Sequence, residues 1–113
     1  MAVSKDLVAA SATPLILSIL AEGESYGYAI IKRVRHLSND QMQWADGMLY
    51  PVLHRLEAQK LVRSRWVASK IGRKRKYYWL TRKGMKILRS SQNQWRLVYS
   101  TLTKLWGESP CLT

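Results

Sequence analysis

The chain has 113 residues, which suits one compact domain with a modest core and leaves little room for a second. Lys and Arg number 19 against 7 Asp and Glu, and a formal net charge of +12 disfavours a compact state unless a polyanion binds. The longest apolar stretch, residues 14–21 with Ser18 inside it, is far shorter than the roughly 20 residues that span a bilayer. These features exclude a membrane-spanning protein and favour a nucleic-acid partner.

The basic charge is concentrated in the second half of the chain. Every acidic residue except Glu108 lies at or before Glu57, whereas basic residues continue from Lys60 without an opposing carboxylate. Membrane-binding helices pair basic residues with a wide apolar face, but here the densest basic run lies between two strand-like segments, which favours nucleic acid. Cys111 is the single cysteine, so no intrachain disulfide can form. The amino terminus shows no charged region followed by a cleavable apolar segment, so we expect a cytoplasmic protein.

The first helix is expected between Leu7 and Ala21, where apolar residues are crowded enough for burial on more than one side. Pro14 interrupts this segment. Either Thr13 and Pro14 cap and begin a new helix, or the proline kinks one continuous helix, and helix propensity does not choose between them.

A second helix is expected from about Tyr26 to Leu37, after a turn at residues 22–25 in which Ser25 would serve as the helix cap. Residues 38–40 would end it. Spacings of four, four and three predict one apolar face, made by Tyr26, Ile30, Val34 and Leu37.

Asp46 is the expected cap of a third, short helix. Four apolar residues at helical spacing would share its buried face, namely Leu49, Val52, Leu53 and Leu56. Three polar or amphipathic residues are then left to point outward, namely Tyr50, His54 and Arg55.

The periodicity changes after Lys60. Residues 61–68 alternate as in a strand, and residues 76–80 form a second predicted strand, with a basic loop at 69–75 that contains Gly72. Two strands joined by a basic loop, directly after a short helix with exposed polar residues, predict a winged-helix arrangement.

Thr81 would cap a last helix from Arg82 to about Trp106, roughly 37 Å long at about 1.5 Å per residue. Its larger side chains recur at spacings of three and four, as in a helix that packs lengthwise on another: Met85, Leu88, Gln92, Trp95, Tyr99, Leu102 and Trp106. Such a stripe can be part of the core of one chain, but a stripe that extends beyond the domain favours an interface between two chains. We therefore divide the chain into a winged helix-turn-helix domain at 1–80 and a dimerisation helix with a short tail at 81–113.

Several short motifs follow one another in a specific order: Tyr26-Gly27-Tyr28 with Ile30, the segment from Gly47 to Glu57, Trp66, Gly72-Arg73, Arg75-Lys76-Tyr77-Tyr78, Leu80-Thr81 and Gly84. Together they resemble the PadR family of bacterial transcriptional regulators, in its short-tailed subgroup. Met48 stands where the family usually has Thr or Ser, and Lys60 stands where a Gly usually ends the helix; Lys tolerates the left-handed conformation poorly.

The resemblance implies a mainly helical fold with a two-stranded β-wing, in which the first and last helices build a two-fold dimer. It further implies that residues 47–57 form the recognition helix of a sequence-specific repressor, which acts on a palindromic operator of its own or a neighbouring gene.

A recognition helix presents donors, acceptors and apolar groups to the major groove. The expected DNA contacts from this helix are Met48, Tyr50, Pro51, His54 and Arg55. Basic residues of the wing suit phosphate contact or entry into the minor groove, although not all can face the same phosphates. These are Lys70, Arg73, Lys74, Arg75 and Lys76.

Trp95 and Tyr99 would meet their symmetry mates across a dimer axis, where the resemblance implies a pore that stacks a planar aromatic ligand. Packing of the dimer alone explains the two residues equally well. His36, His54 and Cys111 form no metal-ligand spacing or catalytic set, so we expect no enzyme, metal or cofactor. The alternative function is a non-specific architectural DNA- or RNA-binding protein.

Overall fold

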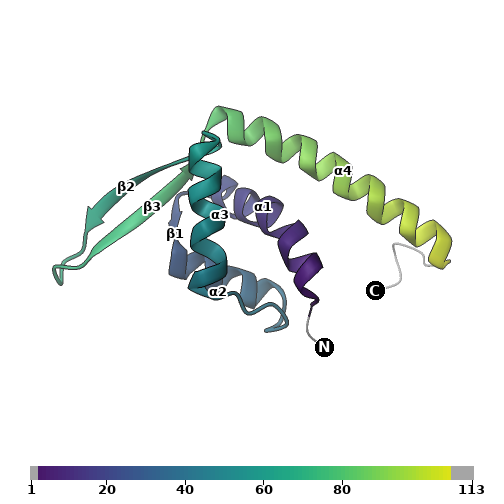
Figure 1. Ribbon diagram of the computed structural model, residues 1–113, viewed down its shortest axis with the longest axis horizontal. Coiled ribbons are helices and arrows are strands. Elements are labelled where there is room, and N and C mark those ends of the chain that lie inside the picture. Colours follow the sequence, from purple (N-terminus) through teal and green to yellow (C-terminus); the bar gives the residue numbers. More distant parts are fainter. Residues whose placement is uncertain (1–2, 108–113) are drawn as a thin grey trace.

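In the computed structural model, residues 3–107 are described, and within that range four helices and three strands follow in the order α1, β1, α2, α3, β2, β3, α4 (Figure 1). The predicted fold class, mainly helical with a β-wing, is confirmed. No helix in the described range is long and apolar enough to cross a membrane. Cys111 and Glu108 lie outside the described residues.

α1 (Lys5–Ala21) is one helix with Pro14 inside it, which resolves the alternative left open by the sequence. The helix begins after Ser4, whose hydroxyl oxygen accepts a hydrogen bond from the Leu7 amide at 3.3 Å. Thr13 is therefore not a cap. Burial on more than one side is confirmed, because the fully buried positions follow one another closely: Ala12, Ile16, Leu17, Ile19 and Leu20.

α2 (Gly27–Leu37) begins differently from the prediction. Ser25 is not its cap, because it belongs to the two-residue strand β1 (Ser25–Tyr26), and Tyr26 precedes the helix without making a side-chain cap hydrogen bond. A strand this short has no alternation for a sequence pattern to detect. The prediction that Leu37 lies on the buried face is wrong, since it is 55% exposed at the end of the helix, whereas Ile30 and Val34 are buried.

α3 (Asp46–Ala58) starts after Ala45, so Asp46 lies in the first helical turn and is not the cap. Its carboxylate suits the positive end of the helix dipole there. The predicted core face is confirmed: Leu49, Leu53 and Leu56 are fully buried and Val52 packs against them.

Lys60, two residues beyond the end of α3, adopts a left-handed backbone with a φ of 63°. Lys60 thus makes the turn after α3 at a position where glycine is usual, and a residue with a side chain is strained in the left-handed conformation. The Leu61 amide then donates to the Leu56 carbonyl at 2.9 Å, which closes the turn into the sheet.

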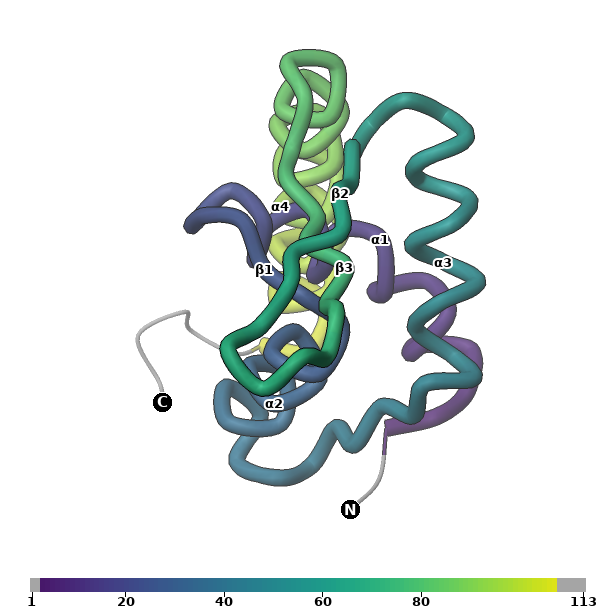
Figure 2. The backbone as a smooth tube through the Cα atoms, turned by 90° about the vertical axis from the view of Figure 1, so that its left-hand side faces the viewer, coloured from purple at the N-terminus to yellow at the C-terminus, as the bar shows by residue number. Residues whose placement is uncertain are grey.

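β2 (Val62–Ala68) and β3 (Lys74–Leu80) form the predicted antiparallel hairpin, with Val62 opposite Leu80 and Ala68 opposite Lys74. The second strand starts at Lys74, two residues earlier than expected. β1 adds a third, unpredicted strand on the other edge of β3, so the sheet order is β1-β3-β2. Figure 2 looks onto the hairpin from its tip.

α4 (Arg82–Trp106) has the predicted bounds and the predicted cap, because the Thr81 hydroxyl accepts from the Gly84 amide at 3.0 Å. The helix packs on α1 and then runs on past the winged domain, towards the side opposite the wing (Figure 1). Gly84 is required for its start, since a Cβ at this position would collide with the Leu61 carbonyl. Of the predicted stripe, Leu88 is buried, whereas Tyr99 and Trp106 are more than half exposed.

Candidate nucleic-acid interface

The outward side of α3 is made mainly of small and polar residues. The exposed positions of the helix recur at helical spacing: Asp46, Gly47, Pro51, His54, Arg55 and Ala58. Small side chains allow a helix backbone to approach a groove closely. Gly47 and Ala58 are not among the contacts predicted from the sequence, although their spacing from Pro51 and His54 is a signal for them.

His54 and Arg55 are both exposed to solvent, as the sequence predicts, but their side chains contact different parts of the protein. His54 sits beside Tyr50, with 6.4 Å between the two ring centroids. Arg55 is directed to α1, where its guanidinium Nη2 donates to the Thr13 hydroxyl at 2.9 Å. A DNA contact by Arg55 would therefore be made from a side chain that is already oriented.

Tyr50 does not point freely outward, which corrects the prediction for this residue. It is half-buried and lies against Gly27 at the start of α2, so closely that a Cβ at position 27 would come within 2.7 Å of the ring carbon bearing the hydroxyl. The pairing of Gly27 with Tyr50 explains why both residues stand at these positions: they set the separation of α2 and α3.

Met48 is likewise not an outward-facing side chain. It is half-buried and packs against the hydrophobic core, on the flank of α3 near the loop that connects α2 and α3. The sequence pattern does not predict whether Met48 is buried or exposed, because this residue lies at the boundary between the buried and exposed sides of the helix.

The five predicted wing cations divide into two groups. Lys70, Arg73 and Lys74 are exposed at the hairpin tip and make none of the ion pairs found among residues 3–107. Arg75 instead stacks its guanidinium over Tyr26, 4.4 Å from the ring centroid. Lys76 is half-buried, with its ammonium 3.7 Å from a Glu57 carboxylate oxygen.

The loop at the wing tip is closed by its own backbone. The Ser69 amide donates to the Arg73 carbonyl at 2.7 Å, and Gly72 takes a φ of 86° that a side chain would strain. Ile71 is 83% exposed at this tip, between the basic residues. Ile71 is absent from the predicted site, although an apolar residue inside a basic loop is itself a signal.

A groove of about 390 Å³ separates the wing from α3 and the start of α2. Aromatic rings and cations share its walls: Tyr26, Tyr28, Tyr50, His54, Trp66, Lys74, Arg75, Lys76 and Tyr78. Trp66 and Tyr28 are well exposed, and the sequence pattern assigns neither to the site. Trp66 lies in β2, where the strand register decides to which face it turns, and Tyr28 lies in the first turn of α2.

Acidic residues of the first half neutralise basic residues away from the wing tip. Glu22 pairs with Arg33 and Glu24 with Arg65, each at 2.8 Å. The hydrogen bond from Arg33 holds the pKa of the Glu22 carboxyl below its ordinary value and raises the pKa of the Arg33 guanidinium. None of these ion pairs involves the wing-tip residues Lys70, Arg73 and Lys74.

Among residues 3–107, no group of three or more His, Cys, Asp or Glu side chains could hold a metal ion. The site thus consists of an exposed helix side, a cationic hairpin tip and an aromatic groove between them. Such a surface is suited to binding a nucleic acid.

The profile of the transcriptional regulator PadR-like family matches residues 16–90 of the chain, from the buried half of α1 into α4. The chain belongs to this family. PadR-like proteins are transcription regulators that bind DNA and are not enzymes, so the exposed side of α3 and the wing belong to a DNA-binding regulator.

Solved structures with the same fold include a transcriptional regulator from Clostridium thermocellum, with a TM-score of 0.82 and 29% identity over 90% of this chain and 96% of that chain. A PadR-like transcriptional regulator from Bacillus cereus has a TM-score of 0.79 and 28% identity, covering 93% of this chain and 100% of that chain. An uncharacterised protein of Lysinibacillus sphaericus is 29% identical over 93 residues, which are 82% of this chain and 85% of that protein.

In this PadR-like chain, Trp95 forms part of the wall of an apolar pocket of about 420 Å³ between α1 and α4. Leu7, Pro14 and Leu15 supply the α1 side, and Arg96 is the charged residue of the lining. Tyr99, one helical turn further along α4, is not part of this wall. The predicted stacking of Trp95 and Tyr99 across a dimer axis stays a prediction.

Proposed function

We propose that the chain is a homodimeric repressor that reads a palindromic operator through α3 and its wing. The observation that carries the proposal is the groove that the wing shares with α3, where Lys74 and His54 line the same space. Two further exposed cations, Lys70 and Arg73, lie at the adjoining hairpin tip. Bases would be read by Pro51, His54 and Arg55, with Tyr50 and Met48 shaping the helix surface from its flanks. The wing cations would bind phosphates.

The dimer would form through the terminal helices, so that residues 1–80 bind DNA and residues 81–113 include the dimerisation helix. Its support is the large exposed apolar surface of α4, which one chain leaves uncovered. Of the predicted contacts, Gln92, Leu102 and Trp106 remain available to a partner, whereas Leu88 is buried and Met85 packs against the core of its own chain. The exposed residues Leu97, Val98 and Leu105 widen the surface.

A planar aromatic ligand would bind in the apolar pocket that contains Trp95, with Tyr99 nearer the dimer axis. Arg96 in the lining disfavours a cationic ligand and favours an uncharged one. Ligand binding between α1 and α4 would change the angle between the two winged domains and release the operator. Calorimetric titration of uncharged planar compounds into the wild type and Trp95→Ala tests this, and equal affinities would leave Trp95 as a packing residue.

The DNA-binding proposal is tested by fluorescence anisotropy on the intergenic DNA upstream of the protein's own gene. A shuffled duplex of the same composition is the control. A specific regulator keeps its preference for the upstream fragment at raised salt, because base contacts resist salt better than phosphate contacts do. An architectural protein, the alternative function, would bind both duplexes alike.

A further inference from the structure

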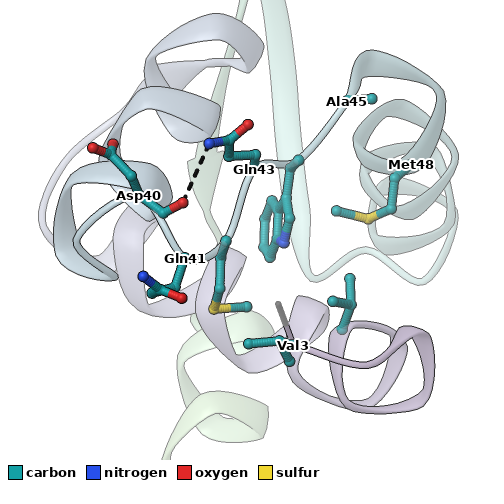
Figure 3. A pocket seen from close by; sticks show the side chains of 9 residues that line it. Val3, Asp40, Gln41, Gln43, Ala45 and Met48 are labelled. Carbon is teal, nitrogen blue, oxygen red and sulfur yellow. Dashed lines mark hydrogen bonds between the residues drawn. The ribbon is translucent and has the colours of Figure 1, made fainter. Parts of the chain in front are cut away.

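A pocket of about 580 Å³ lies between the residues at the start of α1, the α2–α3 loop and the first turn of α3. Figure 3 shows Val3, the loop residues Asp40, Gln41 and Gln43, and Met48 of α3 arranged around one common space. The remaining lining includes Val8, Met42 and Trp44, so most of the wall is apolar. A mainly apolar pocket with few polar groups is the usual form of a small-molecule site.

The indole of Trp44 forms part of the wall of this pocket, and its buried N–H is an unused hydrogen-bond donor. Trp44 is only 7% exposed, and its Nε1–H has no hydrogen-bond partner among residues 3–107. A buried tryptophan N–H normally finds an acceptor, because burying it without one costs free energy. An acceptor atom that enters the pocket would supply the missing hydrogen bond.

The charges of the pocket restrict what can bind. Among the lining residues within 3–107, Asp40 is the one charged residue and none is Lys or Arg, although the whole chain carries +12. An anionic ligand would find no counter-charge. Met42 and Met48 are flexible thioether side chains, so they can move aside to expose the indole nitrogen to an apolar molecule.

We propose that this pocket binds a small, uncharged heteroaromatic molecule whose acceptor atom receives the hydrogen bond of the Trp44 Nε1–H. The site is separate from the Trp95 wall, although the two pockets share Val3 and Met42. Its occupant would touch Ala45 and Met48, the cap and first turn of α3. An effect on operator affinity rests on the proposed function, whereas binding itself does not.

The test is an NMR titration of the full chain with quinoline, an uncharged ring system with one acceptor nitrogen. Naphthalene, which has the same shape without the acceptor, is the matched control at equal concentration. The chain has 5 tryptophans, and Trp44→Phe identifies the Trp44 indole N–H signal by its disappearance. We expect quinoline to move this proton signal downfield and saturably, and naphthalene to leave it without a downfield shift.

Two variants decide which pocket is responsible. Followed at the Met48 methyl group, quinoline should bind at least fivefold more weakly to Trp44→Phe and with unchanged affinity to Trp95→Ala. A Trp44 signal that stays in place, or a quinoline shift confined to Trp95, would overturn the proposal. Should Trp44→Phe unfold, the wild-type quinoline and naphthalene titrations still decide. No DNA is present, so failure of operator binding is a separate result.

Discussion

At the scale of single residues, the wing shows how neighbouring cations acquire different tasks. Arg73, Lys74 and Arg75 are adjacent in sequence, but strand β3 turns Arg75 onto Tyr26 while the other two stay free at the tip. A cation held over an aromatic ring keeps its charge but has less freedom to follow a phosphate. The three residues therefore allow the effect of a free cation on DNA binding to be compared with that of a cation held over a ring.

We predict that Arg73→Ala and Lys74→Ala each make the fall of log affinity with log salt concentration less steep, on operator and random duplex alike. The expected change is about 0.9 for each phosphate that the variant no longer neutralises. Arg75→Ala, the matched control, should change the slope less. The measurement is anisotropy across a salt series. Equal slope changes in all three variants would mean that the position of Arg75 over Tyr26 does not persist on DNA.

Tyr78 is fully buried, and its hydroxyl has no hydrogen-bond partner among the described residues. Burial, with the Glu57 carboxylate nearby, raises the pKa of Tyr78 from 10.0 to about 12. The unfolded chain therefore gives up this proton first, so stability falls as the pH rises from about 10 through about 12 and is fully present below that window.

Tyr78→Phe should be as stable as the wild type near neutral pH, or more stable, because it removes an unpaired buried polar group. Its free energy of unfolding should also fall less between pH 10 and 12, by about 2–3 kcal/mol at most. Urea denaturation at several pH values measures this against Tyr77→Phe. Parallel alkaline decreases in the wild type and Tyr78→Phe would contradict the account.

At the scale of the elements, the contact between α2 and α3 depends on a residue with no side chain. Gly27 and Gly47 are both helical glycines, but a Cβ would collide with Tyr50 at the first and meet nothing within 4 Å at the second. The same substitution is therefore predicted to have opposite effects at two places.

Gly27→Ala should destabilise the fold by about 1–3 kcal/mol, because Tyr50 must move to make room. Gly47→Ala should stabilise α3 by about 0.5–1 kcal/mol, since alanine is the better helix former. If Gly47 faces DNA, its variant should nevertheless bind the operator more weakly. Thermal unfolding supplies the stability change, and a Gly27→Ala protein as stable as the wild type would remove the proposed role of this contact.

The sequence predicts the elements whose signals are long or chemically distinct. The bounds of α4, its Thr81 cap and the hairpin follow from side-chain periodicity and from the change of period after Lys60. The helix starts are less predictable: Ser25 and Asp46 have the chemistry of caps, but Ser25 pairs with β3, and Ala45 occupies the position before α3. Tertiary contacts decide these cases.

The candidate site is predictable as a region and less so as a set of side chains. The basic loop and the helix before it can be identified, because their composition is local. Tyr50, which the sequence predicts to point outward, is half-buried, and so is Met48. Both lie at the edges of the buried face of α3, where a small rotation of the helix decides exposure. Their predicted DNA contacts stay predictions. The exposure of Trp66 depends on strand register, which the pattern does not determine.

At the scale of the whole molecule, α4 outgrows the domain that it belongs to. The molecule measures 54 × 31 × 23 Å, and the far part of α4 projects beyond the winged domain (Figure 1). Leu97 is 67% exposed and Leu105 79% exposed on this helix. An apolar surface of this kind on a small chain is expected to be covered by a partner.

Charged residues at Tyr99 and Leu102 should therefore yield a monomer in sedimentation equilibrium, because a buried unpaired charge opposes association. Lys86→Glu, at an exposed position of α4 outside the predicted stripe and about three turns before Leu97, is the control and should remain dimeric. A Tyr99→Asp, Leu102→Asp double variant that stays dimeric at low concentration would place the interface elsewhere.

The central claim is that two copies of this chain read a two-fold symmetric DNA sequence through α3 and the wing. Selection of bound duplexes from a random library tests it most directly. The account predicts enrichment of a palindromic site whose half-sites are centred about one helical turn apart, roughly 10 base pairs, because two symmetry-related recognition helices must enter successive major grooves. Bound duplexes with no shared sequence, or with a single unrepeated half-site, would contradict it.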